Sequence, residues 1–384
     1  MRVFHFTHEL PQASGVATFV RELDAALGDE GVESRIVLDP RELPDAPEAE
    51  TVLHIHGMWK PVYHQAVKWA KAKGIKIVWS AHGMLAPWSL RHKWWKKLPV
   101  WLAYQWRDLK SAEILHATSG KEVGWIRRLG FRQQIAEVSL GTHLPEVKEV
   151  KVERQNGKVL LFVGRVYPVK AIDRLIAAFA SATDEAKSKG EGERENWQLR
   201  IVGPDQAGHR AELMRLCESL SLTQVVFVGP KYGAELAAEY VGCDALALVS
   251  HTENFGATVV DAMAHGKPVV TSTNTPWQEV ADCGAGWWVD NDPASLAQAI
   301  YELMAMDNAR RTEIGANGRK LVEAKYTWAA VAQQMSEVYR RASGGGAPDT
   351  SPDPYATVVV TALAPRLQAS LSRSCLSETS GCVR

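Results

Sequence analysis

The stretch Val159–Phe179, VLLFVGRVYPVKAIDRLIAAF, joins a short apolar run to an amphipathic segment through a polar loop. Its first five residues are all apolar, which is typical of a strand buried on both faces of a parallel sheet. The loop begins with Gly164 and Arg165 and ends at Lys170. Open parallel sheets bind ligands beyond the carboxyl ends of their strands, so two cations here suit a pyrophosphate. The alternative is a pair of surface charges on an ordinary loop.

The same alternation of short apolar runs and longer amphipathic segments covers most of the chain and predicts an α/β fold built from βαβ units. One series of strands is expected at 3–6, 36–38, 52–55, 75–79, 114–116 and 135–138. A second series is expected at 159–163, 199–202, 225–228, 245–249, 268–271 and 287–289. Two series of this kind predict two Rossmann-like domains, each with a doubly wound parallel sheet.

We expect the first domain to span residues 1–145 and the second to span 157–326. Between the two series, His143–Gly157 is polar, highly charged and without an apolar period, which is typical of an interdomain linker. A helix at 328–341 follows the second series and is expected to pack back on the first domain. Residues 342–384 are rich in Gly, Ser, Pro and Ala, so we expect a largely disordered tail in which only 358–362 could pair locally.

The composition excludes several classes of protein. The 384 residues carry a formal net charge of zero, so there is no global field that would attract nucleic acid. The five cysteines are scattered without metal-ligand spacing, which fits a reducing cytoplasm. The first residues lack the pattern of a signal peptide, and no run approaches the roughly 20 apolar residues of a membrane span. We expect a cytoplasmic protein.

A second segment, ALALVSHTENFGATVVDAMAHGKPVVTS at 245–272, again gives a strand, a polar loop, a helix and a strand. Glu253 ends the loop, and Asn254, Phe255 and Gly256 open the helix. Backbone N–H groups at a helix start form an anion site, and a glycine there allows close approach. The alternative is a helix capped by a nearby acid, with Asp261 solvated.

The spacing of the two acids limits their chemistry. If the intervening residues are helical, Glu253 and Asp261 are separated by roughly 12 Å along the axis. This exceeds the roughly 5 to 9.5 Å between the paired carboxylates of glycoside hydrolases. We therefore expect the two acids to contact opposite ends of one extended ligand, with a sugar at Glu253 and a ribose at Asp261.

These segments resemble those of a known enzyme family. GRVYPVK resembles the G-R-x-x-x-x-K segment, and ENFGATVVD the E-x7-E segment, of the retaining glycosyltransferases of family 4, which have the GT-B fold. The similarity also includes SGVATFV, SAHGMLAPWSL and YTWAAVAQQMSEVY, and so covers about residues 1–341. The resemblance implies two Rossmann-like domains facing across a cleft, with the sugar donor bound by the second.

The resemblance also implies roles for individual residues. Arg165 and Lys170 correspond to the residues that bind the donor diphosphate, Glu253 to the acid that contacts the donor sugar, and Asp261 to the acid that binds the ribose hydroxyls. This chain has Asp at a position where the family usually has Glu. The shorter side chain needs a closer ribose or a bridging water, which we expect to reduce the affinity for the nucleoside only modestly.

Two histidines of the first domain follow predicted strands. The resemblance suggests that His82, after IKIVWSAHG, contacts the reacting sugar, and the alternative is a histidine that caps the next helix. We expect His56 to contact the acceptor or the sugar. A metal site built from His54, His56 and His82 is conceivable but lacks a carboxylate or cysteine. By resemblance, the backbone near Gly15 approaches the diphosphate or the acceptor.

The segment Trp88–Lys110 contains five tryptophans and several cations. On a helix, Trp94, Leu98 and Trp101 share one side, a pattern that suits a membrane interface. The competing interpretation, which we favour slightly, is that the tryptophans fill the core and the cations are solvated.

The string Asp290-Asn291-Asp292 resembles a metal-binding D-x-D motif of other glycosyltransferases, but Asp292 precedes a proline and is well placed to cap a helix. We favour the cap and expect no metal and no cofactor beyond the nucleotide sugar.

We therefore expect a retaining hexosyltransferase that uses an NDP-sugar and an acceptor hydroxyl, with a glycan or lipid-linked glycan of a bacterial cell-surface polysaccharide as the first candidate acceptor. Other interpretations stay open. An NDP-sugar epimerase of related fold would need no acceptor, and a phosphorylase-like enzyme would need pyridoxal phosphate on a lysine. A sugar-nucleotide-binding protein would bind the donor without turnover.

Overall fold

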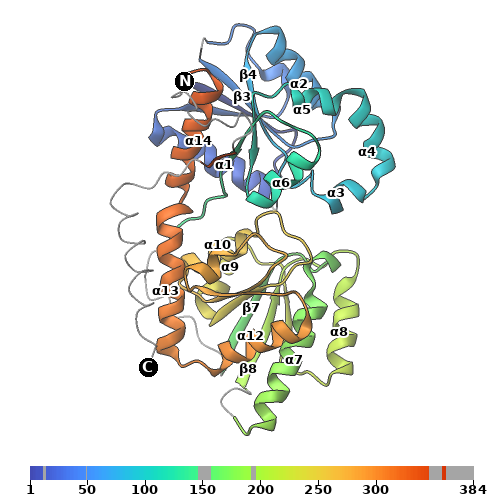
Figure 1. The fold of residues 1–384 in the computed structure, drawn as a ribbon, viewed down its shortest axis with the longest axis vertical. Helices are drawn as coiled ribbons and strands as arrows, with labels where there is room; N and C mark the ends of the chain where they lie inside the picture. Colours follow the sequence, from blue (N-terminus) through green and yellow to red (C-terminus); the bar gives the residue numbers. More distant parts are fainter. Residues whose placement is uncertain (12–13, 49, 146–156, 192–195, 346–356, 360–384) are drawn as a thin grey trace, which may run out of the picture. The chain divides into compact units, whose positions relative to one another are not determined.

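The computed structural model describes residues 1–384 except 12–13, 49, 146–156, 192–195, 346–356 and 360–384. The chain divides into two compact units (Figure 1). Unit 1 comprises Met1–Gly141 together with Ala324–Arg384, and unit 2 comprises Thr142–Glu323. Most of the expected linker, and most of the tail that we expected to be disordered, lies outside the described residues.

Unit 1 is built on a parallel sheet of seven strands in the order β13-β6-β5-β4-β3-β1-β2. The strands are β1 (Arg2–Phe6), β2 (Glu33–Val37), β3 (Thr51–His56), β4 (Lys76–Ser80), β5 (Ile114–Ala117), β6 (Gln134–Glu137) and β13 (Thr357–Val359). Each strand predicted in the first half overlaps one of these. β13 lies in the segment that we expected to be largely disordered, and it pairs with β6 rather than with a neighbouring part of that segment.

The helices of unit 1 cover both faces of the sheet. They are α1 (Gly15–Leu27), α2 (Pro61–Ala72), α3 (Pro87–Arg91), α4 (Trp94–Val100), α5 (Trp106–Lys110), α6 (Gly120–Arg128) and α14 (Trp328–Ala342), with a π-helical turn η3 (Trp101–Gln105) between α4 and α5. Alternate strand residues point to opposite faces. Val3 and Val52 pack with α1 and α14, whereas Phe4 and Leu53 pack with α2 in the other cluster.

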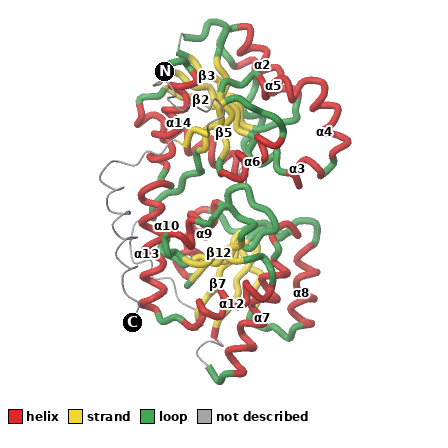
Figure 2. The backbone as a smooth tube through the Cα atoms, viewed as in Figure 1, coloured by secondary structure: helices red, strands yellow, loops and turns green. Residues whose placement is uncertain are grey.

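Unit 2 contains a parallel sheet of six strands in the order β12-β11-β10-β7-β8-β9. The strands are β7 (Lys158–Val163), β8 (Trp197–Val202), β9 (Val225–Gly229), β10 (Ala245–Leu248), β11 (Val269–Ser272) and β12 (Gly286–Val289). The helices are α7 (Ile172–Ser188), α8 (His209–Ser219), α9 (Gly233–Gly242), α10 (Ala257–Ala264), α11 (Glu279–Asp282), α12 (Pro293–Ala305) and α13 (Asn308–Lys325). Figure 2 shows the strands at the centre of each unit with helices around them. The two α/β sheets confirm the predicted fold class.

Helix α14 is tied to the first sheet by a tight contact at its start. Its first residue, Trp328, is buried in the same core cluster as Phe19 of α1 and Val52 of β3. The Trp328 ring lies so close to Gly141 that a Cβ atom at position 141 would be 2.6 Å from the ring atom Cδ2. Glycine is therefore needed at 141 for α14 to pack against unit 1.

We predict that Gly141→Ala lowers the stability of unit 1, because the added methyl group must displace a rigid, buried indole. Overpacking of this kind costs about 1–3 kcal/mol, which calorimetry should record as a lower melting temperature. The matched control is Gly124→Ala in α6, where an added Cβ has no heavy atom of the described residues within 4 Å. The control should keep or slightly raise the melting temperature, since alanine favours a helix by about 1 kcal/mol. Equal melting temperatures for the two variants would contradict the packing of Trp328.

Candidate functional site

The carboxyl ends of β7 and β10 carry the two loops singled out in the sequence. These strands are neighbours in the sheet of unit 2, so residues about 80 positions apart in sequence meet at one edge. The backbone N–H of His251, in the loop after β10, donates to the carbonyl of Val169, in the loop after β7, at 2.8 Å. The two loops are therefore joined through their backbones as well as by the sheet.

Lys170 and Glu253 form an ion pair between these loops. The Lys170 Nζ atom lies 2.5 Å from Glu253 Oε2, and each side chain is only 15% exposed. Ser250 Oγ donates to the same carboxylate oxygen at 3.1 Å. The low exposure limits screening by water and salt, so the pair fixes the position of both charges. The sequence indicated both residues as candidates but not their direct contact.

Arg165 extends toward the other neighbour of β7. Its Nη1 donates to Oε1 of Gln206 at 2.9 Å, in the loop after β8. Arg165 and Lys170 therefore contact different loops from the two ends of one short segment. Sequence reasoning missed Gln206, and the signal that could have found it is its position just after a predicted strand.

The start of α10 has a backbone that only glycine fits. Gly256 is the N-cap residue with φ of 83°, and a Cβ atom there would be 2.8 Å from Leu248 Cδ2. Trp277 Nε1 donates to the carbonyl of Phe255, which is buried. Because the N-cap residue Gly256 has no side chain to cap α10, the helix start offers backbone donors for an anion next to Glu253.

Asp261 lies further along α10 in a polar but enclosed environment. Thr142 Oγ1 donates to Asp261 Oδ1 at 2.7 Å. Burial raises the pKa of the Asp261 carboxyl to about 6, against the opposing effect of the Thr142 hydrogen bond. Asp261 is thus not the solvated surface acid of the alternative interpretation.

Unit 1 contains a buried group of hydrogen-bonded histidines. His54 Nδ1 lies 2.8 Å from the Tyr339 hydroxyl of α14, and His54 Nε2 lies 2.7 Å from Ser80 Oγ. Ser80 Oγ is also 2.5 Å from Nδ1 of His116. Burial lowers the pKa of His116 to about 4, so the group is uncharged near neutral pH. Part of this arrangement follows from strand β3, in which the alternate residues His54 and His56 share one face.

A second series of contacts runs from His5 through His56 to His82. The His5 Nδ1 to His56 Nε2 distance is 3.0 Å, and the His56 Nδ1 to His82 Nε2 distance is 3.1 Å. Burial lowers the pKa values of His5 and His82 to about 3 and that of His56 well below its ordinary value. A neutral imidazole has one N–H and one lone pair, so all protons of the series must point in the same direction. The tautomer of His82 is thereby coupled to that of His5.

His56 differs from the sequence-based expectation. We expected this residue to contact the acceptor or the sugar, but it is fully buried and both ring nitrogens are hydrogen-bonded to other histidines. His56 therefore supports His82 from behind. His82 itself is only partly buried and has φ of 49°, an uncommon value for a residue with a side chain.

Three of these histidines could supply metal ligands by their geometry. Ring nitrogens of His5, His54 and His56 lie within 4.8 Å of one another. His54 is also hydrogen-bonded to Tyr339 and Ser80, and His56 to His82, and the group of three histidines contains no carboxylate or thiolate. Its chemistry therefore matches a neutral hydrogen-bonded network at least as well as a metal centre.

Two other candidate positions are resolved by local geometry. Asp292 caps α12 through its Oδ1 atom, which accepts from the N–H groups of Ala294 and Ser295, each at 3.0 Å. The predicted cap is confirmed. Gly15 is the exposed first residue of α1, and an added Cβ there would meet no described atom within 4 Å. The described part of the fold does not itself require a glycine at position 15.

The tryptophans of Trp88–Lys110 are more exposed than we expected. Trp94 and Trp95 are 57% and 58% exposed, and Trp88 is 47% exposed. Our slight preference for the core is therefore wrong for these residues. Helical periodicity places Trp94 and Trp101 on one side, and both line a surface pocket, although Trp101 also packs against the core of unit 1.

Residues 145–321 match the family described as Glycosyl transferases group 1. The D-inositol 3-phosphate glycosyltransferase of Kineococcus radiotolerans is 36% identical over 215 residues, covering 52% of this chain and 48% of that protein. An uncharacterized glycosyltransferase of Methanocaldococcus jannaschii is 32% identical over 221 residues, covering 57% of this chain and 50% of that protein. The chain thus spans about half the length of these relatives.

Solved structures resemble the chain over a larger part of its length. The sucrose-phosphate synthase of Thermosynechococcus elongatus gives a TM-score of 0.67 at 22% identity, covering 88% of this chain and 98% of that one. HepE of Anabaena, in complex with UDP and glucose, gives 0.65 at 17% identity, covering 89% and 100%. WaaG, a glycosyltransferase involved in lipopolysaccharide biosynthesis, gives 0.61 at 16% identity, covering 88% and 99%. At these identities the likeness shows the GT-B fold. Together with the match over residues 145–321, it makes the chain similar to the GT-B glycosyl transferases of group 1.

Proposed function

We propose that the chain is a retaining glycosyltransferase that moves a hexosyl group from an NDP-sugar to an acceptor hydroxyl. The observation that carries this proposal is the contact between Lys170 and Glu253, which brings the two donor-binding segments of the family together in unit 2. A ligand at this edge of the sheet meets cations, a helix start and a carboxylate at once. These are the groups that a sugar diphosphate needs.

In the proposed mechanism, negative charge grows on the leaving diphosphate as the glycosidic bond breaks. Arg165, Lys170 and the N–H groups at the start of α10 stabilise this charge and lower the barrier. Glu253 orients the sugar, and Asp261 accepts hydrogen bonds from the ribose. The leaving phosphate oxygen takes the proton of the attacking hydroxyl on the same face, which retains the anomeric configuration. Following the resemblance, His82 and the backbone near Gly15 contact the reacting groups.

The proposed reaction needs no metal ion and no cofactor besides the nucleotide sugar. Two cationic side chains and a helix start supply positive charge for the diphosphate, and Asp292 of the D-x-D string is engaged as a helix cap. UDP is the first nucleotide to test, because HepE of Anabaena is solved in complex with UDP-glucose. A thermal-shift comparison with GDP and ADP identifies the base, since a ligand of the native state raises its melting temperature.

We predict that Arg165→Ala and Lys170→Ala each lower kcat about 10²- to 10³-fold, the range for removing one group that stabilises transition-state charge. The matched control is Lys187→Ala in α7, whose partner is the exposed Asp184 at 3.5 Å. It should keep wild-type turnover. Melting temperatures test whether each variant is folded. Near-normal turnover in either active-site variant would remove the diphosphate assignment.

We predict that affinity for the NDP-sugar rises with pH between about 5 and 7. The carboxyl of Asp261 has a pKa of about 6 in the free protein, and hydroxyl donors favour its ionised form. At a pH below this pKa, Asp261 must therefore lose a proton when the donor binds. This deprotonation lowers the apparent affinity for the NDP-sugar. Calorimetric titration with UDP-glucose measures the effect, since its diphosphate diester does not titrate in this range. Asp261→Asn should flatten the profile and weaken binding at pH 8, and an unchanged profile would contradict the ribose role.

We propose a lipid-linked glycan of a cell-surface polysaccharide as the acceptor and peripheral contact with the cytoplasmic face of a membrane. The support is the exposure of Trp88, Trp94 and Trp95 among cations, an arrangement that favours an anionic interface. Among the described residues, no helix combines the length and the apolar character needed to cross a bilayer. Product analysis with a lipid-linked glycan and with D-inositol 3-phosphate, the compound in the name of the relatives, separates two acceptor classes.

We predict salt-sensitive flotation of the protein with vesicles that contain phosphatidylglycerol but not with purely zwitterionic vesicles. Lys93→Glu/Lys96→Glu should abolish flotation, because both lysines are exposed near the tryptophans. A control with the same change in net charge is Lys187→Glu/Lys231→Glu in unit 2, which should still float. No salt-sensitive binding by the wild-type protein would rule out the membrane contact.

A further inference from the structure

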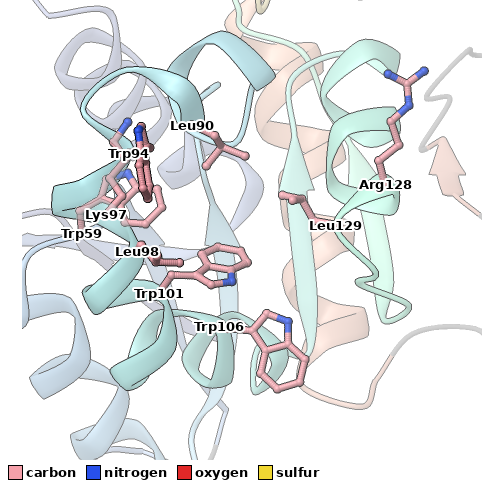
Figure 3. A pocket seen from close by; sticks show the side chains of 9 residues that line it. All are labelled: Trp59, Leu90, Trp94, Lys97, Leu98, Trp101, Trp106, Arg128 and Leu129. Atoms are coloured by element: carbon pink, nitrogen blue, oxygen red, sulfur yellow. The ribbon is translucent and has the colours of Figure 1, made fainter.

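Helices α4 and α6 and the turn η3 of unit 1 border an apolar pocket of about 420 Å³. Figure 3 shows Leu90, Trp94, Leu98 and Trp101 on one side of the pocket and Leu129 on the other. The volume lies within the roughly 300–1,000 Å³ of ligand pockets in proteins. If a methylene group takes about the 30 Å³ share of a water molecule, the space holds on the order of a dozen chain carbons.

Polar contacts behind the pocket hold its wall in place. The backbone N–H of Trp59, a lining residue, donates to Oε1 of Gln105 at 2.8 Å, and the Tyr104 hydroxyl donates to the Trp59 carbonyl at 3.2 Å. Gln105 is fully buried, and both partners lie in the π-helical turn η3. Trp59 has φ of 76°. Because an uncommon backbone conformation persists only when its surroundings fix it, the pocket is a formed feature of the fold.

The residues that line the pocket include two cations, Lys97 and Arg128, and no acid. Residues 51–107 contain ten lysines and arginines but no aspartate or glutamate. Within the pocket, Lys97 donates to the Ser89 carbonyl and lies 5.4 Å from the centre of the Trp59 ring. No carboxylate of the described residues forms an ion pair with Lys97 or with Arg128, which also lines the pocket. A bound molecule with negative charge would supply the counter-charge that these cations lack.

We infer that this pocket binds one hydrocarbon chain of an anionic amphiphile, with the phosphate of its headgroup held by Lys97 and the neighbouring cations. The apolar lining matches the chain and the cations match the headgroup. Binding of a single chain in the pocket goes beyond the proposed membrane contact. A flat membrane surface would contact every exposed tryptophan, whereas a chain in the pocket would contact only the tryptophans that line it. Trp94 and Trp95 separate the two cases, because they are equally exposed and only Trp94 lines the pocket.

The test is calorimetric titration of the full chain with dodecyl phosphate below its critical micelle concentration. We expect saturable binding of about one molecule per chain. Trp94→Ala should weaken binding about tenfold or more, whereas Trp95→Ala should change it less than about twofold. Lys97→Gln should weaken dodecyl phosphate binding, and dodecyltrimethylammonium should not bind to the wild-type protein. Leu129→Trp, which fills the pocket from α6, gives an independent variant if Trp94→Ala does not fold.

Four results would overturn the inference. Equal losses in Trp94→Ala and Trp95→Ala, or uptake that does not saturate, would mean partition onto exposed tryptophans. Binding of inorganic phosphate as tight as that of dodecyl phosphate would mean a site for anions alone. The titration contains no sugar donor, so its outcome does not depend on transferase activity, and activity without amphiphile binding would refute this inference while leaving the proposed function standing.

Discussion

The candidate donor site depends on one constraint of the fold, the position of β7 beside β10 in a parallel sheet. This pairing brings Lys170 and Glu253 together from loops separated by more than 80 residues. A partly buried ion pair contributes little net stability, because desolvation of the charges offsets much of their attraction. The main effect of the ion pair is to fix the positions of the Lys170 and Glu253 side chains relative to each other. The backbone bond from His251 to Val169 holds the two loops at the same place without any charge.

The two carboxylates of the segment after β10, those of Glu253 and Asp261, have different surroundings. Glu253 is neutralised by a cation at 2.5 Å, whereas Asp261 is enclosed with a hydroxyl donor and has a raised pKa of about 6. Their environments agree with the spacing argument, in which one acid serves each end of an extended ligand. The start of α10 at Gly256, where the N-cap residue has no side chain, lies between them in sequence.

Much of this architecture follows from local sequence patterns. Each strand that was predicted from an apolar run overlaps an observed strand. The Asp292-Pro293 pair correctly indicated a helix cap. Properties that depend on distant residues could not be read in this way. Periodicity placed Trp94 and Trp101 on one side of a helix, but whether that side meets the core is decided by tertiary packing. The burial of His56 is of the same kind, because His5 and His82, which occupy its nitrogens, come from other elements.

Net charge is a poor guide to what unit 1 can attract. The chain as a whole is neutral, yet the run from 51 to 107 has ten cations and no acid. Screening limits the reach of exposed charges to about 8–10 Å at physiological salt, so only nearby acids, such as Glu9 beside Lys60 and Glu113 beside Lys76, offset these cations. The buried histidines of the same unit do not add to the positive charge, because burial keeps them uncharged. Unit 1 therefore combines buried, uncharged histidines with an exposed segment, residues 88–97, that is rich in tryptophan and lysine.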